Sequence, residues 1–128
     1  MSALSTTADS PSILVVEDHV MIALDVEMML KSGGYRVIGP VASVAAALKK
    51  IDEQMPDAAV LDANLGAEMV FAVADTLAAA RVPFLLLTGH TSDVLPAEHR
   101  QRPILNKPFQ KRDLLAALGQ AMTLSQAA

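Results

Sequence analysis

"ILVVED", residues 13–18, decides the fold of this chain, because an uninterrupted apolar run ends there in two carboxylates. Val and Ile favour strands, and an apolar run without polar alternation is typical of a strand that is covered on both faces. Short apolar runs recur along the chain, at residues 13–16, 35–42, 58–62, 82–87 and 103–105. The first, third and fourth lack alternation, so the sequence predicts five strands with at least these three buried in a parallel sheet.

Helical patterns separate the apolar runs. They cover residues 19–34, 43–55, 68–80 and 111–122, with a weaker and shorter one at 90–102. Gly33 and Gly34 suit a helix C-terminus, and Ser43 suits an N-cap. Five strands alternating with helices predict a doubly wound parallel α/β sheet with right-handed crossovers.

Composition limits the class of protein. A chain of 128 residues suits one domain, and 52% hydrophobic residues exclude a disordered chain. The aromatic content is only 3%, so the methionines of the first helix, Met21, Met28 and Met29, are expected to fill the core. A flexible tail is expected at 1–11, one folded domain at 12–122, and a C-terminal tail at 123–128.

Charge and hydropathy exclude several functions. A net charge of −4 argues against broad nucleic-acid binding, which needs a concentrated basic face. The apolar runs are too short to span a bilayer, and the N-terminus lacks the pattern of a secretory signal. The chain has no cysteine, which removes disulfides and thiolate ligands. A cytoplasmic protein that binds neither membrane nor nucleic acid is expected.

Polar residues follow the apolar runs at the point where each predicted strand ends. These residues are Glu17, Asp18, Asp62, Asn64, Thr88, Gly89 and Lys107. In a doubly wound sheet, ligands bind beyond the carboxyl ends of the strands, so these side chains should share one site.

The chemistry of the expected site follows from its residue types. Carboxylates held close together repel, unless a cation neutralises them, and all-oxygen ligands suit Mg²⁺. A carboxylate beside Mg²⁺ can attack phosphorus and form an acyl phosphate. Lys107, a point charge on a long stem, is then aimed at an anionic centre on Asp62.

Four motifs, "ILVVED", "AAVLDANL", "LLLTG" and "ILNKPF", resemble the receiver domain of two-component response regulators in both order and spacing. The resemblance spans residues 12–122 and implies the CheY-like, flavodoxin-like fold with strand order 2-1-3-4-5. It implies that Asp62 accepts a phosphoryl group from a histidine kinase or phosphotransfer protein. Such a chain catalyses only its own phosphorylation and dephosphorylation, and signals by a conformational change to a possible downstream target.

The resemblance also implies a role for each site residue. Mg²⁺, with Mn²⁺ as a possible substitute, is held by Glu17, Asp18, Asp62 and the backbone carbonyl of Asn64. Thr88 and Lys107 bind the phosphoryl oxygens, and Pro108 forms a cis bond with Lys107.

Other positions tune the phosphoryl group or carry the signal in this family. By this resemblance, Asn64 and His90 would flank the attacking water, beside Gly89. Many receivers have Tyr or Phe where this chain has Ile104, so Ile104 and Pro108 define a switch region without a ring to swing. Phosphorylation is therefore expected to pull Thr88 inward and redistribute residues 89–102.

The fourth predicted strand resembles an alphaproteobacterial subgroup that typically reads Phe-Ala-Thr-Gly and an aromatic residue, from which Leu86, Leu87 and His90 depart. A monomer or weak dimer is expected. Three alternatives are a Toprim-like Mg²⁺-dependent nucleic-acid enzyme, a phosphatase of the haloacid dehalogenase type, and a pseudo-receiver that only binds partners. The first two favour Asp-x-Asp where this chain has Asp62-Ala63-Asn64. The third is disfavoured by the intact set of Asp18, Asp62, Thr88 and Lys107.

Overall fold

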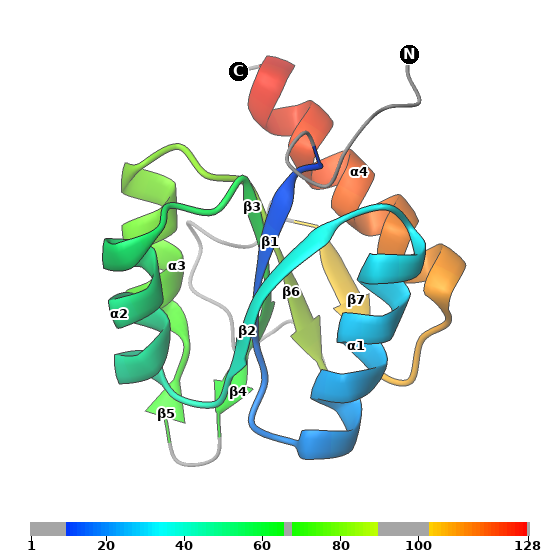
Figure 1. Cartoon of the computed structure of the whole chain (residues 1–128), viewed down its shortest axis with the longest axis horizontal. Coiled ribbons are helices and arrows are strands. Elements are labelled where there is room, and N and C mark those ends of the chain that lie inside the picture. Colours follow the sequence, from blue (N-terminus) through cyan, green and yellow to red (C-terminus); the bar gives the residue numbers. More distant parts are fainter. Residues whose placement is uncertain (1–9, 66–67, 90–102, 128) are drawn as a thin grey trace.

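A five-stranded parallel sheet forms the centre of the molecule (Figure 1). The computed structural model describes residues 10–65, 68–89 and 103–127. The strands of the sheet are β1 (Ser12–Val16), β2 (Arg36–Val41), β3 (Ala58–Asp62), β6 (Phe84–Thr88) and β7 (Ile104–Asn106). Their order is β2-β1-β3-β6-β7, which is the predicted order 2-1-3-4-5, so the predicted fold class is confirmed.

Four helices cover the two faces of the sheet. They are α1 (Val20–Ser32), α2 (Val44–Glu53), α3 (Phe71–Ala79) and α4 (Lys111–Ala127). In Figure 1, α2 and α3 lie on one side of the sheet, and α1 and α4 lie on the other. Strand β1 pairs with β2 on one side and with β3 on the other. The order in which strands are added to the sheet therefore reverses at β1, as a doubly wound fold requires.

The core has two layers because successive side chains of a strand point to opposite faces. In β1, Leu14 and Val16 pack in the layer beneath α2 and α3, whereas Ile13 and Val15 pack in the layer beneath α1 and α4. All five residues of β1, β3 and β6 are buried. This burial on both faces explains why these three runs are apolar without alternation.

The helix ends follow local rules. The Ser43 hydroxyl accepts a hydrogen bond from the Ala46 N–H at 3.1 Å, so Ser43 caps α2 as predicted. Helix α1 ends at Ser32 with Gly33 as its C-cap, and Gly34 follows with a φ of 93°. A second left-handed position follows α3, where Arg81 has a φ of 63°.

Several predicted boundaries were wrong. The predicted helix at 68–80 begins only at Phe71, because Glu68–Met69 forms strand β5, which pairs in a hairpin with β4 (Asn64–Leu65). The Val70 N–H bonds to the Ala63 carbonyl at 3.3 Å, which closes this hairpin.

At the C-terminus, α4 continues to Ala127, through most of the segment 123–128 that was expected to be a tail. The weak helix predicted at 90–102 and residues 1–9 of the expected N-terminal tail lie outside the described residues.

The expectation that the α1 methionines fill the core was wrong for two of them. Met21 and Met28 are 63% and 69% exposed, whereas Met29 packs against the layer beneath α1 and α4. Within the described part of the chain, no helix combines the length and apolarity that crossing a membrane requires.

The left-handed turn after α3 gives a test of the fold. Arg81→Gly should raise the free energy of unfolding by about 0.5–1 kcal/mol, because glycine adopts a positive φ without the steric penalty of a Cβ. Ala80→Gly, one residue earlier at a φ of −88°, should instead lower it by a similar amount. Urea denaturation measures both, and a loss of stability in Arg81→Gly would contradict the left-handed assignment.

Candidate functional site

The polar residues singled out in the sequence follow the carboxyl ends of neighbouring strands. Because β1, β3, β6 and β7 are parallel, these ends lie at one edge of the sheet, which is the lower edge in Figure 1. Helix α1 and the β4–β5 hairpin both begin at this edge. The site is therefore built from four segments that are distant in sequence.

Three carboxylates form the centre of the site. One oxygen each of Glu17, Asp18 and Asp62 lies within 4.8 Å of the others. Glu17 and Asp62 are buried, at 2% and 4% exposure, whereas Asp18 is exposed. The group therefore opens to solvent on the Asp18 side, and the repulsion among its charges is strongest at the two buried acids.

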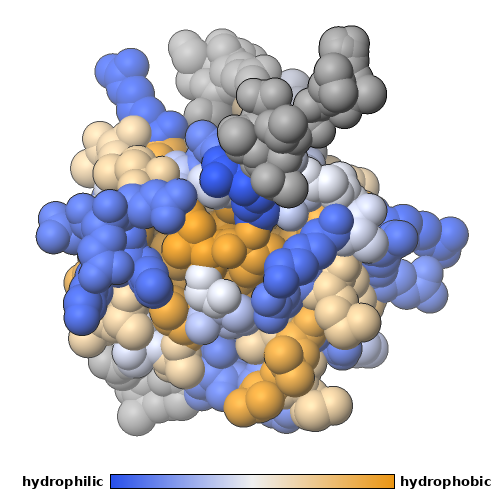
Figure 2. Space-filling view, viewed as in Figure 1, coloured by the Kyte–Doolittle hydropathy of each residue, from blue (hydrophilic) through white to orange (hydrophobic). Residues whose placement is uncertain are grey.

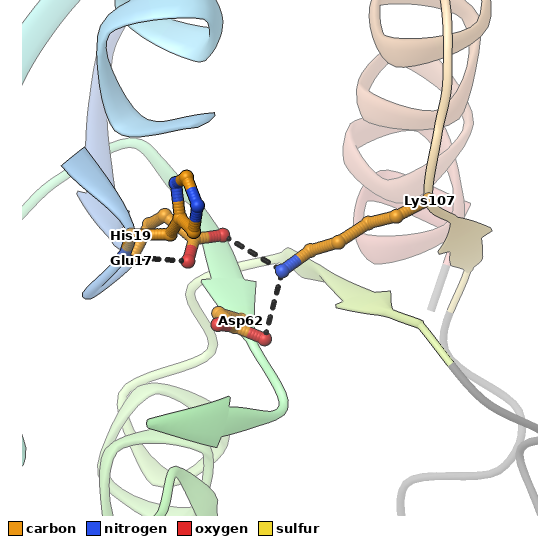
Figure 3. Close-up of polar contacts among 4 residues, drawn as sticks. All are labelled: Glu17, His19, Asp62 and Lys107. Carbon is orange, nitrogen blue, oxygen red and sulfur yellow. Dashed lines mark hydrogen bonds and ion pairs between the residues drawn. The ribbon is translucent and has the colours of Figure 1, made fainter. Parts of the chain in front are cut away.

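Lys107 reaches across from the end of β7 and contacts both buried acids (Figure 3). Its Nζ lies 3.0 Å from Glu17 Oε1 and 3.4 Å from Asp62 Oδ1. The sequence predicted that Lys107 points at an anionic centre on Asp62, and its shorter contact is with Glu17. One ammonium faces three carboxylates here, so the residues brought together leave a negative charge that a cation can neutralise.

Glu17 is held from two directions. Its backbone N–H donates to the Val41 carbonyl of β2 at 2.9 Å, and its Oε2 accepts from the His19 N–H at 3.0 Å. Its Oε1 is buried and accepts no hydrogen bond of suitable geometry, so its contact with Lys107 is an ion pair alone. A buried carboxylate oxygen with spare acceptor capacity fits the coordination of a hard cation.

Thr88 ends β6 beside the acids. It is 6% exposed, and its backbone carbonyl accepts the Lys107 N–H at 2.8 Å. This hydrogen bond continues the β6–β7 pairing and fixes the position of the Lys107 backbone. The next residue, Gly89, is exposed at the same edge.

The remaining predicted residues fall in different places. Asn64 begins β4 directly after this edge, with its backbone paired to Met69, and its side chain lies outside the described part of the structure. His90 also lies outside it. Ile104 is partly buried against the layer beneath α2 and α3, and the Lys107–Pro108 bond is cis, as the resemblance implies.

Two contributors were missed from the sequence. The His19 N–H donates to the Glu17 carboxylate, and a backbone donor leaves no side-chain pattern in the sequence. The Val41 carbonyl holds the Glu17 backbone, and no side-chain pattern marks a carbonyl. Gly39-Pro40, inside a predicted strand, was an available signal, since this pair in a strand indicates a bulge.

The family model for the response regulator receiver domain matches residues 13–119. This chain belongs to the response regulator receiver family. The match covers every strand of the sheet except the first residue of β1, and all the residues of the site. Members of this family are regulatory proteins rather than classical enzymes.

Similar proteins place the chain more narrowly. The solution structure of SdrG from Sphingomonas melonis Fr1 is 38% identical, with a TM-score of 0.79 over 89% of this chain and 97% of that one. The phyllosphere-induced regulator PhyR of Methylorubrum extorquens is 32% identical over 91% of this chain. These relatives support the predicted alphaproteobacterial subgroup.

The curated relatives are longer than this chain. The match covers 45% of PhyR, and it covers 63% of the transcriptional regulatory protein PdtaR of Mycobacterium tuberculosis, which is 26% identical over 96% of this chain. The similarity therefore concerns the receiver portion of each relative.

Lys107 should be essential to the stability of the metal-free site. Lys107→Met leaves the buried Glu17 carboxylate without its cation, so the free energy of unfolding in EDTA should fall by roughly 2 kcal/mol or more. Lys111→Met, at the exposed start of α4, should change it by less than about 0.5 kcal/mol. Equal effects of the two variants in urea denaturation would contradict the role given to the Lys107 ion pairs.

Proposed function

We propose that this receiver accepts a phosphoryl group on Asp62 from the phosphohistidine of a histidine kinase or phosphotransfer protein, in a Mg²⁺-dependent reaction. The observation that carries the proposal is the placement of Asp62 among acids with the Lys107 ammonium 3.4 Å from its Oδ1. A buried structural aspartate needs one partner, whereas this one lies beside two more carboxylates that repel it. Such an arrangement suits binding of a ligand that changes the local charge.

The proposed transfer is a displacement at phosphorus. A carboxylate oxygen of Asp62 forms a bond to the phosphorus atom while the bond from phosphorus to the histidine nitrogen breaks, and the nitrogen keeps the electron pair. The product is an acyl phosphate on Asp62 and a neutral histidine on the donor after the nitrogen is protonated. The protein's contribution to phosphoryl transfer is mainly positioning and charge neutralisation.

Lys107 and Thr88 supply the neutralisation and positioning from the chain itself. The Lys107 ammonium already lies between Glu17 and Asp62, so it needs little movement to contact a phosphoryl oxygen on Asp62. Thr88 ends the neighbouring strand, and its hydroxyl is the proposed second donor to the phosphoryl oxygens on Asp62. The hydrogen bond from the Lys107 N–H to the Thr88 carbonyl keeps the two residues at the same edge of the sheet.

The carboxylates fit a divalent cation. Three oxygen ligands within 4.8 Å, one of them exposed to solvent, suit Mg²⁺, which prefers oxygen ligands and keeps some of its water. Glu17, Asp18 and Asp62 would hold it, with the Asn64 carbonyl as a proposed fourth ligand, and Mn²⁺ could replace it. When bound, the ion neutralises carboxylate and phosphoryl charge.

A donor protein has to cover the edge of the sheet where Asp62 lies, and the neighbouring surface of α1 suits such a contact. Val20, Met21, Leu24 and Met28 are 47–70% exposed, and the apolar surface on the lower part of α1 is visible in Figure 2. Exposed apolar surface of this kind is typical of protein interaction sites. We therefore assign this face to the phosphodonor protein.

The proposed route of the output signal starts from Ile104, which stands where many receivers have an aromatic residue. Ile104 has no ring or hydroxyl to move, and it packs, partly buried, against the core layer beneath α2 and α3. The proposed consequence is that movement of Thr88 passes to residues 89–102 and to the surface around β7 and α4, where a downstream protein would read it.

Phosphorylation of Asp62 is the direct test. With acetyl phosphate and Mg²⁺, intact-mass measurement should show one added phosphoryl group on the wild type and none on Asp62→Asn. Asp57→Asn is a matched control, because Asp57 precedes the same strand at the opposite edge, where its Oδ2 accepts from the Ser12 N–H at 2.7 Å. It should be phosphorylated like the wild type. An added phosphoryl group on Asp62→Asn would refute the assignment. No added phosphoryl group on any of the three proteins, the wild type included, would favour the pseudo-receiver.

Magnesium should relieve the repulsion among the carboxylates. At ten times its dissociation constant, Mg²⁺ should stabilise the wild type by about 1.4 kcal/mol, because it binds only the folded state. The gain should be much smaller in Asp62→Ala, which lacks a ligand, and unchanged in Asp25→Ala on the exposed face of α1. Thermal denaturation with and without Mg²⁺ measures this, and equal gains in all three proteins would place the ion elsewhere.

A further inference from the structure

Strand β2 contains one more residue than the strand that it pairs with. Leu14 of β1 lies opposite Ile38, whereas Val16, two residues later, lies opposite Val41, three residues later. A regular ladder would place Pro40 opposite Val16, so β2 has a bulge at Gly39-Pro40. Bulges in parallel pairs are rare, and they redirect the strand that contains them.

Gly39 makes this bulge possible. Its φ is 94°, a conformation that residues with a Cβ rarely adopt. A Cβ at this position would also lie 2.8 Å from the Val41 backbone nitrogen and 3.2 Å from the Val15 carbonyl oxygen. Both neighbours are backbone atoms of the paired strands, so they cannot move aside without shifting the pairing of β1 with β2.

The bulge determines which carbonyl meets the end of β1. Because of the extra residue, the Val41 carbonyl accepts the Glu17 N–H at 2.9 Å. Glu17 is the first residue after β1, and its buried side chain contacts Lys107 and lies in the carboxylate cluster with Asp18 and Asp62. One backbone hydrogen bond therefore links the bulge to the segment that carries two of the three carboxylates.

We propose that Gly39 is a positioning residue for the cation site: its bulge in β2 sets the Val41 carbonyl, which fixes the end of β1 and thereby the Glu17 and Asp18 carboxylates. This inference rests on the proposed Mg²⁺ site. Strand β2 contributes no side chain to the carboxylate cluster. It would nevertheless influence the affinity of the cluster for a hard cation. Residues that orient metal ligands without contacting the metal commonly change metal affinity by roughly ten- to a hundredfold when they are replaced.

Gly34, in the turn that precedes the same strand, offers a matched control. Its φ is 93°, almost the same as that of Gly39, but a Cβ there would meet nothing within 4 Å. Alanine at either position imposes the same kind of backbone strain, and both variants should lose stability. Only Gly39→Ala should disturb the pairing between β1 and β2 next to the site.

The test measures Mg²⁺ affinity by isothermal titration calorimetry in the folded wild type, Gly39→Ala and Gly34→Ala. Gly39→Ala should bind Mg²⁺ roughly tenfold more weakly than the wild type, while Gly34→Ala should bind it with unchanged affinity. Gly39→Asn serves as a second variant, because asparagine adopts positive φ more readily but still carries the obstructing Cβ. It should also bind more weakly.

Amide hydrogen exchange in the metal-free proteins gives a readout that does not depend on Mg²⁺. The Glu17 amide should exchange faster in Gly39→Ala than in the wild type and Gly34→Ala, because its bond to Val41 is weakened. Equal affinity and equal Glu17 protection in the two alanine variants would overturn the inference while leaving the Mg²⁺ site intact. The inference would also be overturned if neither Gly39 variant folds while Gly34→Ala does. The bulge would then be required for the stability of the whole fold.

Asp18→Ala distinguishes this inference from the proposed function. If the wild type binds Mg²⁺ and Asp18→Ala does not, the proposed site is supported, whatever the Gly39 variants show. A wild type that binds no Mg²⁺, or an Asp18→Ala variant that binds it with wild-type affinity, would contradict the proposed site and this inference together.

Discussion

The close approach of Glu17, Asp18 and Asp62 is the constraint on which the rest of the structure depends. Three carboxylates with oxygens within 4.8 Å of one another repel, and two of them are buried, where water screens the repulsion least. They remain together because β1 and β3 are neighbouring parallel strands that end at the same edge. The energy that keeps them there comes mainly from the buried apolar layers on both faces of the sheet.

Lys107 moderates this repulsion from the far side of the site. It comes from β7, two strands away from β3, and it reaches the acids because Thr88 of β6 holds its backbone. The ammonium contacts Glu17 at 3.0 Å and Asp62 at 3.4 Å, so it is shared between them. A shared cation over three acids leaves net negative charge, which makes the site responsive to any ligand that changes the charge balance.

The sequence predicted the scaffold well because the scaffold depends on local patterns. Runs such as Ile13–Val16 are apolar on both faces, and this pattern is typical of strands inside a covered sheet. Ser43 marks the start of α2 because a cap is a property of a few adjacent residues. The prediction was wrong at 68–80, where Glu68–Met69 pairs with Asn64–Leu65 in a hairpin. It was also wrong for Met21 and Met28, because apolar residues on a helix do not reveal which of them faces the sheet.

By itself, the sequence determined the five-stranded doubly wound fold and the identity of the residues at its carboxyl edge, from Glu17 to Lys107. It did so because strand ends in a parallel sheet meet at one edge whatever the details of packing. Only the tertiary structure decided that Lys107 lies nearer to Glu17 than to Asp62, and that the Val41 carbonyl holds Glu17 through a bulge at Gly39. Distances between side chains from different strands depend on register, and register is set by contacts between segments that no local pattern records.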